Sequence, residues 1–199
     1  MPRRPRVPKR AANPVGPAQP RPPLQFFTAD EADLVEAITA RLVPVDDSGP
    51  GAREAGALIY IDRAVAGYFS SLQVFYREGF AAIDALAQRR HRKAFTALGE
   101  AEQDTILRAI ETPQGPDGSE RLAQFFAVIH EHTIEGMFGD PVYGGNRDFV
   151  GWRMIGFPGA QPGYTPEQML AGPKLHAIPM RGLADIQGSS PAAKGPPRS

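Results

Sequence analysis

One stretch limits the possible folds more than any other, the 28 residues from Gly136 to Gly163. It holds 8 of the 21 glycines and the only tryptophan, Trp152. Glycine tolerates φ angles above zero and lets a second backbone approach closely, whereas proline removes an N–H donor and fixes φ. The stretch also contains four further aromatic residues, Phe138, Tyr143, Phe149 and Phe157. This composition is too broken for a helix and too aromatic for a linker, so we predict an ordered, packed loop of the kind that carries function.

The rest of the middle of the chain has the periodicity of helices. Apolar residues recur three and four positions apart, the spacing of one helix face. This pattern and the helix-ending signals predict helices over 28–43, 52–70, 73–94, 100–110, from 120 into the loop, and a short one over 165–170. No segment has the pattern of a strand, and 174–183 is predicted to be irregular. We therefore predict an all-α fold, a compact bundle of about five helices with one long packed loop.

Several helix details can be predicted. Thr28 and Glu31 form a capping box, and Ser119 is a good N-cap residue. Gly56 and Gly67 lie inside the helix predicted over 52–70 and are interpreted as points of close helix–helix contact. The buried stripe of that helix is predicted to comprise Leu58, Ile61, Val65, Tyr68 and Phe69.

The two ends of the chain differ from the middle. Residues 1–23 contain eight prolines, six basic residues and no acidic residue, and residues 186–199 are rich in glycine, serine, proline and alanine. Such segments bury too little apolar surface to offset the entropy of ordering, so both are predicted to be disordered tails around a helical domain at 24–185. That domain holds 14 basic and 22 acidic side chains, a formal charge of −8. This charge argues against a nucleic-acid-binding body.

The composition excludes some classes of site. The chain has no cysteine, which rules out disulfides, thiol catalysis and iron–sulfur ligation by this polypeptide. No run approaches the roughly 18 apolar residues of a membrane helix. Arg3-Arg4 is similar to the start of a twin-arginine signal, but prolines and cations follow instead of an apolar region, so we expect no export signal here. The basic tail is interpreted as solvated, the alternative being a segment that binds anionic lipid, RNA or an acidic partner.

One helix carries the nearest approach to a set of metal ligands, namely His130, Glu131, His132 and Glu135. Residues three or four apart share a helix face, so Glu135 pairs with Glu131 or with His132. The zincin pattern H-E-x-x-H is absent, and no second such pair occurs on another helix. Structural roles are therefore favoured, and a metal site stays open as the alternative.

The loop offers a second candidate site. Tyrosine and tryptophan anchor interfaces, and Asn and Asp bond to backbone in turns. We expect the loop to bind a partner protein, to brace the part that does, or to pack on the bundle itself. The candidate partner-binding residues are Asp140, Tyr143, Gly144, Gly145, Asn146, Asp148 and Trp152.

The same loop carries a resemblance to a known family. Its pattern is E-G-x-F-x-D-P-x-Y-G-G-N from Glu135 to Asn146, followed by Gly151-Trp152, Ile155-Gly156 and Pro158-Gly159. Earlier pieces agree, among them Phe27-Thr28, Leu42-Val43-Pro44, Glu54-Ala55-Gly56, Ile61-Asp62-Arg63, Tyr76-x-x-Gly79 and Phe95-x-x-Leu98 with Gln103. Over about 26–159 the chain resembles the small (gamma) subunit of membrane-bound, FAD-dependent sugar and sugar-acid dehydrogenases, the gluconate 2-dehydrogenase subunit 3 family.

The resemblance implies an accessory role. In that family the flavin sits in a large partner of the glucose–methanol–choline oxidoreductase type, and a cytochrome c subunit carries haem. The small subunit binds the flavoprotein and is needed for its maturation and export. The leading hypothesis is therefore a non-catalytic subunit without a cofactor of its own, periplasmic or membrane-associated, or cytoplasmic if residues 1–23 direct no export. The alternatives are a small metal-binding protein or metalloenzyme using 130–135, and an interaction protein whose basic arm binds anionic surfaces.

Overall fold

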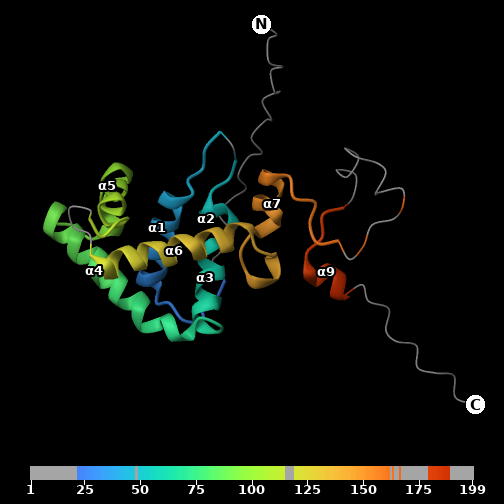
Figure 1. The fold of residues 1–199 in the computed structure, drawn as a ribbon, viewed down its shortest axis with the longest axis horizontal. Coiled ribbons are helices and arrows are strands. Elements are labelled where there is room, and N and C mark those ends of the chain that lie inside the picture. Colours follow the sequence, from blue (N-terminus) through green and yellow to red (C-terminus); the bar gives the residue numbers. More distant parts are fainter. Residues whose placement is uncertain are drawn as a thin grey trace, which may run out of the picture.

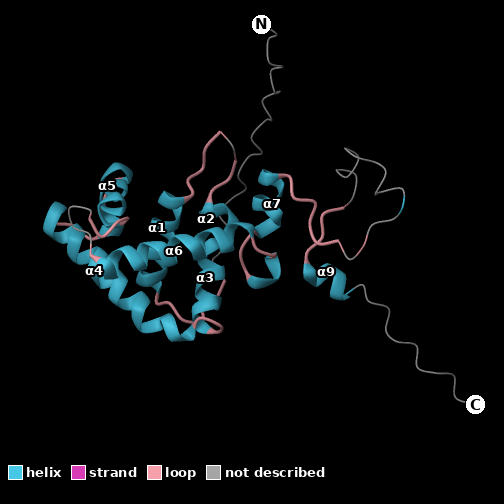
Figure 2. Cartoon of the chain, in the orientation of Figure 1, coloured by secondary structure: helices cyan, strands magenta, loops and turns pink. Residues whose placement is uncertain are grey.

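All regular elements that the structure describes are helices. The computed structural model describes residues 22–47, 49–114, 119–161, 163, 166 and 179–188. Its α-helices are α1 (Ala29–Leu42), α2 (Ala52–Ala55), α3 (Ala57–Ala66), α4 (Gln73–His91), α5 (Glu100–Ile110), α6 (Glu120–Phe138), α7 (Val150–Ile155) and α9 (Leu183–Gly188). Four 3₁₀ helices lie between them, η1 (Ser70–Leu72), η2 (Phe95–Ala97), η3 (Pro141–Tyr143) and η4 (Arg147–Phe149). Figure 2 shows no strand in the described part, which confirms the all-α prediction, although eight α-helices replace the expected five or so.

Helix α6 is the centre of the arrangement. It crosses the body in Figure 1, packs most extensively on α3, and also touches α1, α2, α4, α5 and α7. Helices α4 and α5 lie toward its N-terminal end, whereas the loop with α7 lies at its C-terminal end. The first three residues of the predicted loop, 136–138, belong to α6, and the rest of the loop begins where this central helix stops.

The core consists of the apolar stripes that the helical periodicity predicts. Burying one large aliphatic or aromatic side chain contributes about 1.5–3 kcal/mol, so a stripe repeated on several helices decides how they pack. The large side chains removed completely from solvent include Val35, Ile38, Ile61, Tyr76, Ile83, Phe95, Ile106, Phe125 and Ile129.

The predicted helix starts are confirmed. The Thr28 hydroxyl accepts a hydrogen bond from the Glu31 amide at 3.2 Å, and the Glu31 carboxylate accepts one from the Thr28 amide at 2.9 Å. The Ser119 hydroxyl accepts from the Leu122 amide at 3.2 Å. Helix α5 has the predicted bounds, whereas α4 ends at His91, three residues before the predicted end.

The helix predicted over 52–70 is wrong in its extent. Gly56 has φ 73° and separates α2 from α3, because this left-handed conformation ends one helix and starts the next. Helix α3 then ends at Ala66, so Tyr68 falls outside the helix and is 91% exposed instead of buried. Phe69 also falls outside the helix and is half-buried, whereas Leu58, Ile61 and Val65 are buried as predicted.

The close helix–helix contact lies elsewhere than predicted. A Cβ atom added at Gly56 would lie 3.1 Å from the Arg147 guanidinium, and one added at Gly67 would meet only its own preceding turn. At Gly136, in contrast, the added Cβ would lie 3.0 Å from the Ala57 Cα. Gly136 therefore allows α6 to pack tightly against the start of α3.

A buried carboxylate fixes the N-terminal end of the described chain. Asp62 on α3 accepts hydrogen bonds from three successive backbone amides, those of Gln25 at 2.6 Å, Phe26 at 3.0 Å and Phe27 at 2.9 Å. The side chain of Asp62 is 1% exposed, and Phe27 packs its ring on Tyr76 and Phe80. The chain before residue 25 thus emerges directly beside α3.

The loop and the C-terminal region need two corrections. The loop was predicted to be too broken for a helix, yet it contains the six-residue helix α7, which includes Gly151 and has Gly156 as its C-cap. Helix α9 starts at Leu183, a residue predicted to be irregular, and continues past the predicted domain end at residue 185. Of the helix predicted over 165–170 only Pro166 is described, and the tails at 1–21 and 189–199 lie outside the described residues.

Candidate functional site

Asn146 holds the loop together. Its side-chain amide donates to the carbonyl of Gly139 at 2.8 Å, and its side-chain oxygen accepts from the amide of Gly151 at 2.9 Å. Its backbone amide donates to the carbonyl of Gly136 at 2.7 Å. The residue is fully buried and has φ 44°, a left-handed conformation that asparagine tolerates better than most residues. One side chain therefore joins the end of α6, the loop and the start of α7.

Two glycines let the loop backbone touch the end of α6. A Cβ added at Gly145 would lie 2.1 Å from the carbonyl oxygen of Gly136, and one added at Gly151 would lie 2.0 Å from that of Met137. Real Cβ atoms do not approach so closely. We call this contact between the end of α6 and the loop the α6–loop seam, defined by Gly136, Met137, Gly145, Asn146 and Gly151.

Trp152 adds a further link between α7 and the end of α6, next to the seam. Its indole N–H donates to the carbonyl of Phe138 at 2.6 Å, and its ring packs on Phe149 and Phe157 at centroid distances of 5.4 and 4.8 Å. The side chain is 5% exposed. A buried tryptophan whose N–H has a partner is a rigid support for the surrounding backbone.

Some of the candidate partner-binding residues support the loop from inside, whereas Tyr143 is exposed. Asn146 and Trp152 are buried braces, and Gly144 and Gly145 allow close approach, with φ 108° at Gly144. Tyr143 is 56% exposed.

The two acidic candidates have different surroundings. Asp148 is exposed at φ 53°. Asp140 accepts from the amide of Val142 at 3.0 Å and from the amide of Leu183 at 2.8 Å, so it ties the loop to α9.

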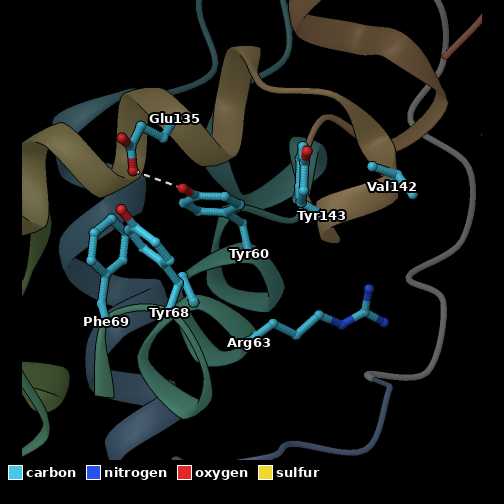
Figure 3. Close-up of a pocket in the computed structure, with 8 residues that line it drawn as sticks. Tyr60, Arg63, Tyr68, Phe69, Glu135, Val142 and Tyr143 are labelled. Carbon is cyan, nitrogen blue, oxygen red and sulfur yellow. Dashed lines mark hydrogen bonds between the residues drawn. The ribbon is translucent and has the colours of Figure 1, made fainter. Parts of the chain in front are cut away.

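A cavity of about 560 Å³ lies beside the exposed edge of the loop. In Figure 3, Tyr68 and Phe69 lie on one side, Tyr143 on the other and Tyr60 between them. We call this cavity the tyrosine groove; it is lined by Tyr60, Arg63, Ala64, Tyr68, Phe69, Glu135, Val142 and Tyr143. Its residues come from α3, the turn between α3 and η1, α6 and η3, so sequence reasoning about single segments missed it. The signal that would have found it is Gly67, read as the end of a helix.

The groove has one satisfied carboxylate and one cation. The Tyr60 hydroxyl donates to Glu135 at 2.7 Å, and burial, followed by this hydrogen bond, raises the pKa of Tyr60 well above its usual range. The Arg63 guanidinium forms no ion pair with any described residue, and in Figure 3 it extends away from the Tyr60–Glu135 pair. Aromatic faces, phenol hydroxyls and a guanidinium suit noncovalent binding of a chain segment or ligand.

Comparison with known proteins identifies the family. The family model described as gluconate 2-dehydrogenase subunit 3 matches residues 29–159, about two thirds of the chain. The chain belongs to the gluconate 2-dehydrogenase subunit 3 family. No curated protein and no solved structure matched.

The family pattern has a structural meaning in this subunit 3 chain. The matched residues begin at α1 and end just after α7, so they include helices α1 to α7 and the loop as far as residue 159. The motif residues that carried the resemblance, Gly136, Gly145, Asn146, Gly151 and Trp152, meet in or beside the α6–loop seam. The pattern therefore encodes how the loop is fixed to α6.

The four possible metal ligands of this subunit 3 chain do not converge. His132 is buried and its Nδ1 lies 2.7 Å from the Tyr76 hydroxyl, whereas His130 is exposed and lies against Phe126. Glu135 is engaged by Tyr60. Within the part of the chain that the structure describes, no three His, Cys, Asp or Glu side chains are placed to hold a metal ion. Among the described helices, none has the length and apolar character of a bilayer crossing.

The stability of the subunit 3 domain should depend on pH through His132. Burial lowers the pKa of His132, against the opposing effect of Glu135 and Glu131, so the folded chain resists protonation below the unfolded value of 6.5. Below pH 6.5 the unfolded state then binds more protons, and the stabilisation present above that pH is lost as pH falls toward the lowered value. We expect the free energy of unfolding, measured by urea at pH 7.5, 6.5 and 5.5, to fall with acidification.

Two matched variants test whether the pH dependence comes from His132 and not from His130. His132→Gln keeps an acceptor for Tyr76 but does not titrate, so its free energy of unfolding should depend less on pH over this range. His130→Gln, at an exposed position on the same helix, should keep the original slope. Identical slopes in all three proteins would contradict the prediction.

Proposed function

We propose that this subunit 3 chain is a non-catalytic partner that docks the FAD-dependent dehydrogenase subunit of its complex and assists its maturation and export. The flavin belongs to that large subunit, of the glucose–methanol–choline oxidoreductase type, and haem to a cytochrome c subunit. The site of action is the periplasm or the membrane surface. Membership of a family described as a dehydrogenase subunit supports the accessory role.

The docking proposal is carried by the positions of the exposed apolar side chains. The described part of the chain exposes eight large hydrophobic residues, and four of them lie inside the loop, in the 16-residue stretch 142–157. These four are Val142 at 42%, Tyr143 at 56%, Ile155 at 58% and Phe157 at 41% exposure. Concentrated exposed apolar side chains on a soluble domain mark interaction surfaces.

The rigidity of the loop supports the same proposal. Asn146 and Trp152 fix the backbone from inside, so the exposed side chains project from a frame that is already ordered. A preorganised surface loses less conformational entropy on association than a flexible one. The buried candidates thus serve the interface indirectly, by holding Tyr143 and Ile155 in place.

Co-purification tests the proposal. The tagged chain is co-expressed with the FAD-dependent dehydrogenase subunit, and recovered flavin and dye-linked dehydrogenase activity are measured. Truncating an interface anchor costs about 2 kcal/mol, roughly a 30-fold change in Kd. The double variant Tyr143→Ala/Ile155→Ala should therefore lose the flavoprotein from the purified complex.

The control is an exposed apolar residue outside the loop. Val74 on α4 is 68% exposed, and Val74→Ala should leave flavoprotein recovery unchanged. Urea midpoints of both variants should match the unaltered chain, because no buried contact is removed. Full recovery of active flavoprotein with the double variant would refute docking through the loop.

A further inference from the structure

The N-terminal arm has a proline period that composition alone does not reveal. Proline occurs at every third position in two runs, at residues 2, 5 and 8 and again at 14, 17, 20 and 23. A polyproline II helix has three residues per turn, so each run would place its prolines on one face. Such segments enter binding sites with little loss of entropy, and aromatic-lined grooves are the surfaces that recognise them.

The tyrosine groove has the chemistry of such a surface. Tyr60, Tyr68, Phe69 and Tyr143 supply aromatic faces for proline rings. A polyproline II helix makes no internal hydrogen bonds, so its carbonyls are free to accept from the hydroxyls of Tyr68 and Tyr143. Tyr68, at 91% exposure, is the most exposed large apolar side chain in the described part of the chain, and a docked segment would cover it.

The arm leaves the domain next to this groove. Three amides from Gln25 to Phe27 are fixed on Asp62, and the following residue of α3, Arg63, lines the groove. A polyproline II segment advances about 3.1 Å per residue, so ten residues span roughly 30 Å. The run that ends at residue 23 therefore has ample length to reach the groove.

Charge selects between the two runs. Residues 14–23 carry a single charge, Arg21, whereas 2–10 carry five cations. The groove contains the Arg63 guanidinium, and its carboxylate Glu135 is already bonded to Tyr60. Arg63 and Glu135 carry opposite charges, so the groove offers no surplus of negative charge for a segment with five cations, whereas the nearly neutral run needs none.

We propose that the tyrosine groove is a polyproline II binding site and that residues 14–23 of the same chain occupy it. Tethering makes the binding intramolecular, with an effective concentration in the millimolar range for short links, so a weak intrinsic affinity is enough. This inference does not depend on the proposed function, because it concerns the free chain.

The lack of cysteine makes a direct test possible. Ala18 lies off the proline face of the run, so Ala18→Cys in the full chain accepts a nitroxide spin label without disturbing that face. In the ¹⁵N-labelled protein, we expect the label to reduce the amide signals of Ala64, Tyr68 and Phe69 at least threefold. Adding Pro17→Ala and Pro20→Ala, or Tyr68→Ala, should restore most of that intensity.

The outcomes separate the possible occupants. Tyr68→Ala removes an exposed side chain, so an unchanged urea midpoint shows that the domain is intact. If the added proline or Tyr68 substitutions leave the signal loss unchanged, the arm is only near the groove and does not bind it, and the proposal is overturned. A second sample mixes chain that carries the spin label but no ¹⁵N with chain that carries ¹⁵N but no spin label. Signal loss in this mixture would assign the groove to a second copy of the chain, which would also overturn the proposal.

Discussion

Asn146→Ala should lower the free energy of unfolding by about 4 kcal/mol, a large part of the 5–15 kcal/mol typical of a domain. The change removes both side-chain hydrogen bonds and leaves the Gly139 carbonyl and the Gly151 amide unsatisfied in a buried place. Each such group costs about 1–3 kcal/mol. Alanine must also hold φ 44°, which costs about 1–2 kcal/mol for a residue with a Cβ. Urea denaturation followed by Trp152 fluorescence measures the effect at the seam itself.

A second substitution at the same position separates the cost of the backbone strain from the cost of the lost hydrogen bonds. Asn146→Gly loses the same hydrogen bonds but adopts the left-handed conformation without strain. It should therefore be more stable than Asn146→Ala by about 1 kcal/mol while still being well below the original chain. If alanine and glycine are equally stable, the backbone at residue 146 is not strained in the way its φ indicates. If both match the unaltered chain, the side chain does not brace the loop.

How much of this structure can be predicted from sequence depends on the range of the interactions. Thr28 with Glu31 and Ser119 with Leu122 are contacts within one helical turn, and both were predicted from residue types alone. The extent of α3 was not predicted, because Gly56 and Gly67 fit a helix interior and a helix end almost equally well. The choice between these alternatives depends on tertiary contacts, among them that of Arg147 with Gly56.

The loop shows the same limit at a longer range. Its glycine and aromatic content predicted an ordered packed segment, and the seam and the ring cluster of Trp152 confirm that. Which candidates point inward was not decidable, since Tyr143 and Trp152 have the same chemical character. Their different exposure follows from the position of the Phe138 carbonyl, which receives the indole N–H. The tyrosine groove required α3, α6, η3 and the turn after α3 to meet, and it had no local signal beyond Gly67.

The seam also predicts which glycines cannot be replaced. Gly145→Ala and Gly151→Ala should each lower the free energy of unfolding by at least about 3 kcal/mol, the upper range for overpacking a tight contact. The added Cβ would lie 2.1 and 2.0 Å from carbonyl oxygens of α6, and a helix backbone cannot withdraw as a flexible side chain does. The loop must lift off α6, which also stretches the bond from the Gly151 amide to Asn146.

Gly163→Ala is the matched control for these two variants. No atom of the described residues lies within 4 Å of an added Cβ there, so alanine should be neutral or slightly stabilising in the same urea measurement. Because the seam fixes the exposed residues Tyr143 and Ile155, both seam variants should also lose the proposed flavoprotein partner, whereas Gly163→Ala should retain it. A seam variant that unfolds at the original urea midpoint would show that the loop does not need this close backbone contact. One that is destabilised but keeps its partner would show that docking does not depend on a preformed loop.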